Sequence, residues 1–367
     1  MSRRSYVPLR VRSTYSFLEG ASHPDELMGE ATRLRLPAVS LTDRDGVYGI
    51  VQAHQALREQ ADALSPGSAV PRLLIGSEVT VELPGVTSPG DPTPIAATPG
   101  DPDRRRTSLV LLAADREGYA RLCGLISAGR MRSPKGESVV TLEELCGSAV
   151  PAPRASASPA PRASAEGRGD GSGGLIALWT DATDGGALGS LSDAFAGALY
   201  IAHARHYRPG DPAAFAEQRR LAERYALPLV AATETLYHAV DRRELHDVVT
   251  CIRYGMTLNE AGARLRPNAS HAMLSAQEMY RRYSDVPELV TRTLEVAERC
   301  AFSLDAIDYR YPNEQVPAGY TTSEWLWELA FAGARRRYGG SIPADVRAQL
   351  QKELALIDEL EYGGYFL

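Results

Sequence analysis

The chain has 367 residues, a net charge of −6 and an apolar content of 44%, which is typical of a globular protein with room for two or three domains. No stretch approaches the ~18 consecutive apolar residues of a membrane span, and the acidic balance is not that of a freestanding nucleic-acid-binding domain. The four cysteines include no C-x-x-C pair, which excludes a zinc ribbon and favours reduced thiols in a cytoplasmic protein.

The first elements are a short strand, a helix and a second strand. Residues 7–12 alternate apolar and polar side chains, the period of a strand. Ser22 and Pro24, followed by two acidic residues, are typical of a helix start. Residues 38–41 are apolar enough for a buried strand, and a polar loop follows them. Polar side chains just beyond strand ends are where α/β folds hold their functional groups.

The next 230 residues continue this alternation of strands and helices. We expect strands at 72–81, 109–113, 175–180, 198–202 and 228–233, and helices at 46–63, 117–128, 212–225 and 242–253. Such alternation predicts parallel strands joined by crossover helices. Periodicity alone does not separate a closed barrel of about seven strands from a doubly wound open sheet.

Two segments interrupt the pattern, and it stops near residue 270. Residues 83–106 and 149–174 are rich in proline, glycine and small polar residues, so we predict that both are disordered insertions. After them the chain is predicted to be helical, at 275–283, 287–300, 321–338 and 343–361. We therefore predict one α/β domain over residues 1–270 and a helical region over residues 271–367.

Several long words of the sequence resemble a known family. YSFLEGASHPDEL, LTDRDGVYGIVQAH, LLIGSEV and DRRELHDVVTCIR are similar to the polymerase-and-histidinol-phosphatase (PHP) domain of bacterial C-family DNA polymerases, closest to the error-prone alpha-subunit type. The resemblance implies a distorted (β/α)7 PHP barrel followed by an α-helical segment that leads into the polymerase palm. It also implies a truncated, N-terminal part of such a chain, whose four last helices we expect to be marginally stable without the palm.

The resemblance points to a changed metal site. Metal-binding relatives end the first strand in H-x-H, and these positions hold Arg10 and Arg12 here; a guanidinium has no lone pair for a cation. Carboxylates remain at Asp43 and Glu78. Other metal-binding positions of the family correspond here to Arg44, Ser108, Thr235 and Tyr237. This set implies a degenerate site with no metal and no catalytic residue, in which we predict that the arginines neutralise the two acids.

The resemblance implies a function only as part of a larger enzyme. We expect an error-prone DNA polymerase in replication and translesion repair, with magnesium only in the palm. Its partners would be the remainder of the polymerase chain, DNA through the full-length enzyme, and other translesion-synthesis proteins. Two alternatives stay open: an active metal-dependent phosphoesterase or 3′–5′ exonuclease, and an arginine-lined module that binds a phosphate or a DNA end. We interpret His203 and His206 as surface or structural residues.

Overall fold

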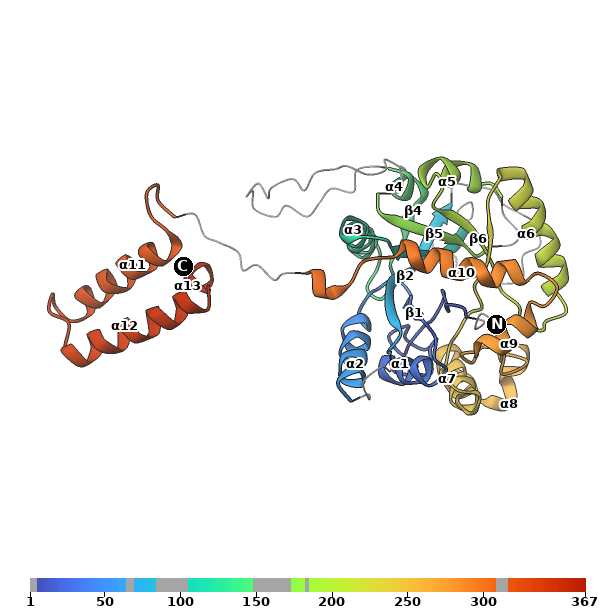
Figure 1. The fold of residues 1–367 in the computed structure, drawn as a ribbon, viewed down its shortest axis with the longest axis horizontal. Helices are drawn as coiled ribbons and strands as arrows, with labels where there is room; N and C mark the ends of the chain where they lie inside the picture. The colour runs from blue at the N-terminus through green and yellow to red at the C-terminus, as the bar shows by residue number, and fades with distance from the viewer. Residues whose placement is uncertain (1–4, 64–68, 84–104, 148–172, 182–184, 308–315) are drawn as a thin grey trace. The chain divides into compact units, whose positions relative to one another are not determined.

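The computed structural model describes residues 5–63, 69–83, 105–147, 173–181, 185–307 and 316–367 (Figure 1). Most of the two predicted insertions lies outside these ranges. Their edges do not: Leu83 and Arg105 are paired neighbours in a β-ladder, and the Gly174 carbonyl accepts a hydrogen bond from the Ala114 amide. The predicted insertion bounds were therefore too wide, because extended pairing continues to both ends of the first segment.

In the residues that the structure describes, the first compact unit, residues 1–306, is built on one curled sheet of seven strands. The strands are β1 (Ala38–Leu41), β2 (Arg72–Leu83), β3 (Arg105–Ala113), β4 (Val140–Thr141), β5 (Leu175–Trp179), β6 (Leu199–His203) and β7 (Leu229–Ala231). Their order is β1-β2-β3-β5-β6-β7, with β4 paired to β2. This mixed α/β architecture agrees with the predicted barrel-like fold.

One strand corrects the prediction that the sheet is parallel. β3 is antiparallel to both β2 and β5, whereas β1–β2, β5–β6 and β6–β7 are parallel. Parallel neighbours need a crossover connection, usually a helix. The sequence between β2 and β3 has no helical pattern. Without a crossover helix, β3 can pair with β2 only in the antiparallel direction.

Residues 8–12 join the two ends of the sheet, although they form only an isolated bridge and not the predicted strand. On one side, the amides of Ser40 and Thr42 donate to the carbonyls of Pro8 and Val11. On the other side, the Arg12 amide donates to Thr235 and the Thr235 amide donates to Arg10. The segment therefore lies between β1 and the chain that follows β7, which places Arg10 and Arg12 inside the curled sheet.

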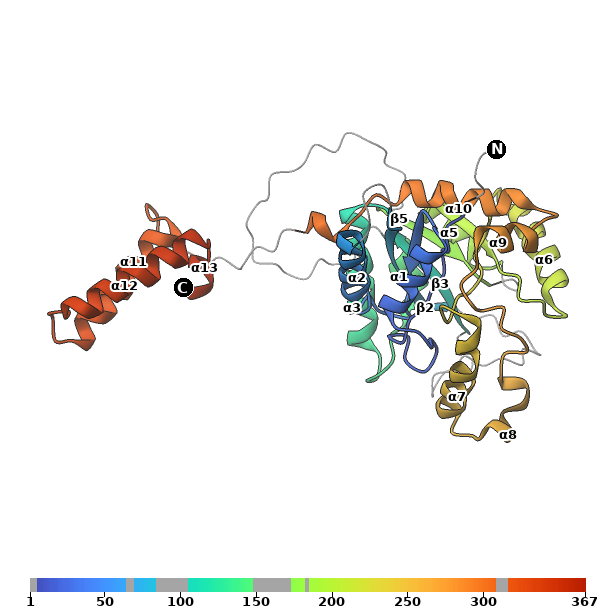
Figure 2. The same cartoon turned by 60° about the horizontal axis from the view of Figure 1, so that its bottom comes forward.

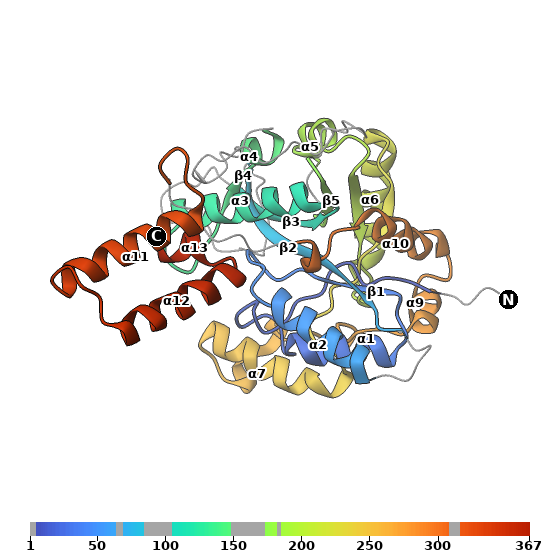
Figure 3. The ribbon, with the colours of Figure 1, turned by 60° about the vertical axis from the view of Figure 1, so that its left-hand side comes forward.

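Helices surround this sheet (Figures 1 and 2). They are α1 (Pro24–Arg33), α2 (Ile50–Ala63), α3 (Arg116–Arg132), α4 (Leu142–Cys146), α5 (Leu188–Ala194), α6 (Asp211–Tyr225), α7 (Arg243–Tyr254), α8 (Leu258–Ala261), α9 (Ala276–Arg282) and α10 (Pro287–Arg299). The short α4, α5 and α8 were not predicted, since a helix of one or two turns carries little periodic signal. α1 and α2 lie side by side along β1 and β2 (Figure 3).

The core shows that α9 and α10 belong to the first unit. Met279, Tyr283, Leu289 and Val290 are buried in the same cluster as Leu27, Val39 and Ile75 of the N-terminal elements. The first compact unit therefore extends to Ala306, and the predicted boundary at 270/271 does not coincide with it. The expectation that the last four helices are marginally stable without the palm therefore does not extend to these two, because their apolar side chains are buried in this core.

The second compact unit, residues 307–367, is a small helical hairpin. It contains α11 (Thr322–Arg337), α12 (Ala344–Glu359) and the short α13 (Gly363–Phe366), which ends the chain. α11 begins at a capping box in which Thr321 and Glu324 bond each other's backbone amides. Leu326 and Leu354 are among its few buried side chains, whereas Tyr365 and Phe366 are exposed.

Candidate functional site

Glu78 is the centre of the predicted site and is completely buried. Arg10 binds it through two nitrogens, at 2.8 and 2.9 Å, and Arg12 binds it through two more, at 3.1 and 2.5 Å. Arg44 Nη2 lies 3.4 Å from Oε1. Burial alone would raise the pKa of Glu78, but Arg10 and then Arg12 hold the pKa well below its usual range. Glu78 is therefore a carboxylate clamped by arginine forks.

Two glutamates that were not predicted complete this cluster. Glu19, in the loop before α1, accepts from Arg12 at 2.7 Å and from Arg44 at 2.9 Å. Glu234, just beyond β7, lies 3.1 Å from Arg12 and 3.4 Å from Arg10. Three arginines thus face three glutamates. We call these six residues the Arg–Glu cluster: Arg10, Arg12, Arg44, Glu19, Glu78 and Glu234.

Asp43 lies beside this cluster but is not clamped by an arginine. Its carboxylate accepts from the Ser13 amide at 2.7 Å, from the Ser13 hydroxyl at 2.8 Å and from the Ser16 hydroxyl at 2.7 Å. Burial raises the pKa of Asp43, and the serine hydrogen bonds only partly oppose it. No arginine forms an ion pair with Asp43 among the described residues; neutral hydroxyl and amide donors occupy both of its oxygens, and the charge of Arg12 acts on its pKa only from a distance.

The remaining predicted positions are distributed around the sheet. Ser108 in β3 is the ladder neighbour of Thr80, and its hydroxyl lies 3.3 Å from that of Thr180. Thr235 contributes backbone hydrogen bonds to residues 8–12. The Tyr237 ring is buried in a small cluster with Ala21, Leu236 and Ala272. None of these three side chains contacts the Arg–Glu cluster through a hydrogen bond or ion pair among the described residues.

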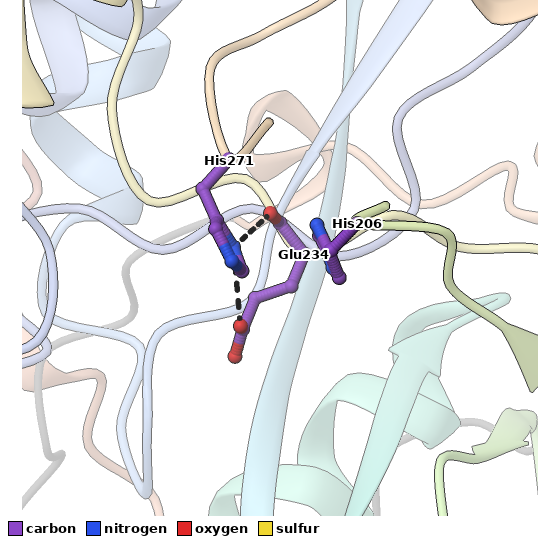
Figure 4. Close-up of side chains that lie close together, drawn as sticks. All are labelled: His206, Glu234 and His271. Carbon is purple, nitrogen blue, oxygen red and sulfur yellow. Dashed lines mark hydrogen bonds and ion pairs between the residues drawn. The ribbon is translucent and has the colours of Figure 1, made fainter. Parts of the chain in front are cut away.

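Two buried histidines extend the cluster, as Figure 4 shows. His206 and His271 stack with ring centroids 3.9 Å apart, and His271 Nδ1 lies 3.3 Å from Glu234 Oε2. Burial lowers the pKa of His206 to about 4 and that of His271 to about 2, so both rings are neutral at pH 7. Of the two interpretations of His206, surface or structural, only the structural one remains, because the residue is 7% exposed.

The donor atoms of His206, Glu234 and His271 lie within 4.8 Å of one another, a spacing that a metal ion could use. The surrounding charge opposes it, because Glu234 also contacts Arg10, Arg12 and Arg266, the last at 3.2 Å. Unit charges 4 Å apart interact by roughly 4 kcal/mol at an effective dielectric of 20. A divalent cation would meet that repulsion from several guanidiniums at once, so these residues do not fit a metal ion well.

The sequence offered weak signals for what was missed. Glu19 lies within the word YSFLEGAS and Glu234 directly precedes Thr235, so both were close to predicted positions. Nothing local marked them as arginine partners, since their contacts are made across the sheet. His271 lies beyond α7 and α8, in the stretch before α9, and no pattern related it to His206.

Part of the sequence matches a known family. Residues 8–150 match the PHP domain family. A solved amidohydrolase from Chromobacterium violaceum, with bound sulfate and no metal, shares 15% identity at a TM-score of 0.36, over 63% of this chain and 88% of that one.

The curated proteins that the chain resembles belong to a more specific group. The chain is 31% identical to an error-prone DNA polymerase of Anaeromyxobacter sp. (strain K) over 99% of its own length and 35% of the relative's. It is 35% identical to that of Ralstonia nicotianae, over 99% of its length and 31% of the relative's. The chain is thus related over almost all of its length to error-prone DNA polymerases, and it spans about a third of their length.

Proposed function

We propose that this chain is part of an error-prone DNA polymerase and that its PHP domain is a non-catalytic structural module. The observation that supports this most strongly is the clamping of Glu78 by Arg10, Arg12 and Arg44. In the family that the chain resembles, the positions of Arg10, Arg12, Arg44 and Glu78 hold metal-binding residues. Here the three guanidiniums supply the positive charge that a metal would supply. The cluster then holds the strand ends together instead of activating water.

The polymerase assignment rests on the relatives. They are larger chains named error-prone DNA polymerase, so the partner of this module would be the remaining two thirds of such a chain. DNA synthesis and its magnesium ions would belong to that part, and contact with DNA would come through the whole polymerase. Translesion repair, further repair proteins and a cytoplasmic location follow from the same assignment. No helix in the described ranges is long and apolar enough to cross a membrane.

The experiment combines metal analysis with activity. The chain is purified without chelators, its metal content is measured, and a chromogenic phosphomonoester and a 3′-labelled single strand are offered with zinc, manganese or magnesium. We expect no stoichiometric metal and no turnover. Two or more metal ions per chain together with turnover would show that the PHP site is active and would overturn the proposal.

A further inference from the structure

The outer face of α7 carries a row of exposed apolar side chains. Its inner face is packed, and His246 on that face lies against the Tyr237 ring. The outer face exposes Leu245, Val248 and Ile252, which are spaced three and four residues apart and therefore form one stripe along the helix. We call these three residues the α7 stripe. Figure 2 shows α7 and α8 together at one end of the first unit.

The α7 stripe differs from the outer faces of the other helices of the first unit. Within the described residues, each of the other helices from α1 to α10 exposes at most one large apolar side chain, as Val51 in α2 and Met131 in α3 do. Single exposed apolar residues are normal on a protein surface, whereas a continuous apolar patch marks a surface that another molecule or domain covers. A helix that is packed on one side and aliphatic on the other is typical of a position between two layers.

An exposed aromatic ring lies in the loop beside α7. The Phe17 side chain is 82% exposed, although the residues around it are held in place. The Ser16 hydroxyl makes a buried hydrogen bond at 2.7 Å, and Leu18 has a φ of 58°, in the left-handed region that a bulky residue seldom adopts. Glu19 binds Arg253 of α7 at 2.9 Å. The loop therefore holds the Phe17 ring in solvent at a fixed place next to α7.

The chemistry of this surface fits a protein partner. Aromatic side chains that are already fixed contribute strongly to protein interfaces, because little conformational freedom is lost on binding. The acids Asp241 and Glu244 are exposed at the start of α7 and just before it, and they would repel DNA or an anionic lipid surface. An apolar centre with a charged border is the usual composition of a protein–protein interface.

We propose that the α7 stripe and Phe17 bind an apolar face of the remaining part of the polymerase chain. This inference rests on the proposed function, and it assigns a surface to the partner named there. The chain spans 35% of one relative and 31% of another, so most of such a polymerase lies outside the structure. A partner in the same chain is present at a high effective concentration, so a stripe of three aliphatic side chains and one aromatic anchor is enough to hold it.

The test compares the 367-residue chain with the full-length polymerase encoded by the same reading frame. Hydroxyl radicals label exposed side chains, and mass spectrometry locates the labels. Labelling of Phe17, Leu245 and Ile252 should fall several-fold in the longer protein, because residues at the centre of an interface lose contact with water. Val51 in α2 is the control and should be labelled equally in both proteins.

The possible failures are distinguishable. Equal labelling of the α7 stripe in both proteins would overturn the docking proposal and leave the polymerase assignment standing. An equal fall at Val51 would mean general shielding and would also overturn it. A reading frame that encodes no polymerase part would overturn the proposed function, and this inference with it.

Variants separate docking from folding. Val248→Ser combined with Ile252→Ser changes only exposed side chains, so the urea midpoint of the 367-residue chain should not change. In the full-length polymerase the same double change should return the labelling of Leu245 and Phe17 to the level of the shorter chain. Val51→Ser, which also alters an exposed valine on a helix, should have no such effect. Protection that survives the double change would contradict the proposal. A dimer of the 367-residue chain that the double change abolishes would identify a second copy as the partner instead.

Discussion

At the scale of single residues, the Arg–Glu cluster holds three guanidiniums and three carboxylates, and two further arginines, Arg253 and Arg266, contact Glu19 and Glu234. Arg12 is the most deeply placed of its arginines, with a side chain 4% exposed, and it contacts Glu19, Glu78 and Glu234. Burying an ion costs several kcal/mol unless partners compensate it. The loss of any one member therefore leaves a charge in the interior that water cannot reach.

We expect Arg12→Ala to lower the free energy of unfolding by about 3–5 kcal/mol, because it leaves buried carboxylates without their partner. Chemical denaturation measures the loss. The matched control is Arg33→Ala, whose arginine pairs with Glu30 on the surface with a side chain 69% exposed; this change should lower the free energy of unfolding far less than Arg12→Ala does.

A double-mutant cycle tests whether Arg12 acts on Glu78. Combining Arg12→Ala with Glu78→Gln should recover part of the loss, because the second change removes the charge that the first left unpaired. Strictly additive costs would mean that the two side chains do not stabilise each other, contrary to the contact at 2.5 Å.

The buried histidines predict a pH dependence. The pKa of His206 falls from 6.5 to about 4 on folding. Below pH 6.5 the unfolded chain takes up a proton at this ring and the native chain does not, so stability falls as the pH decreases towards 4. His206→Gln should flatten this fall by up to about 1.4 kcal/mol per pH unit, as urea denaturation at several pH values would show. An unchanged slope would mean that His206 titrates normally in the native state.

At the scale of the elements, local patterns predicted most helices and strands but not all of their pairing. Amphipathic α1, α7 and α10 were found within a few residues of their ends. β3 was predicted as a strand but its antiparallel direction was missed, although a signal for it was present: no helix pattern separates it from β2. The packing of α10 against the sheet could not be predicted, because an apolar helix face does not say which surface will cover it.

Leu289→Ala in α10 should destabilise the first unit by about 2–5 kcal/mol, because Leu289 is buried in the core that α1, β1 and β2 share. Thermal or urea unfolding of the intact chain measures this. Leu245→Ala in α7 is the control, since Leu245 is 42% exposed, and a change of under about 1 kcal/mol is expected there. Similar losses in both variants would mean that α10 is peripheral.

At the scale of the whole molecule, the two units differ in how much apolar surface they bury. The first unit shares large buried clusters among its sheet and helices. The second leaves Leu329, Leu356 and Leu360 exposed, and small cores provide little net stability. The prediction that the C-terminal helices are marginally stable therefore applies to α11 and α12 only.

Hydrogen exchange should show this difference directly. Amides of α11 and α12 are expected to open at a lower free energy than those of β3 and β5, whose side chains are almost completely buried. Exchange followed by mass spectrometry at several denaturant concentrations provides the measurement. Equal protection in both units would require a packing partner for the hairpin.

Residues 8–12 also affect the order in which the chain can fold during synthesis. They are synthesised before the segments that they join, yet half of their backbone hydrogen bonds are made to Thr235, far later in the chain. Contacts so distant in sequence form late and slowly. Until residue 235 emerges, the nascent chain presents unpaired strand edges on which a chaperone, or a neighbouring nascent chain, can act.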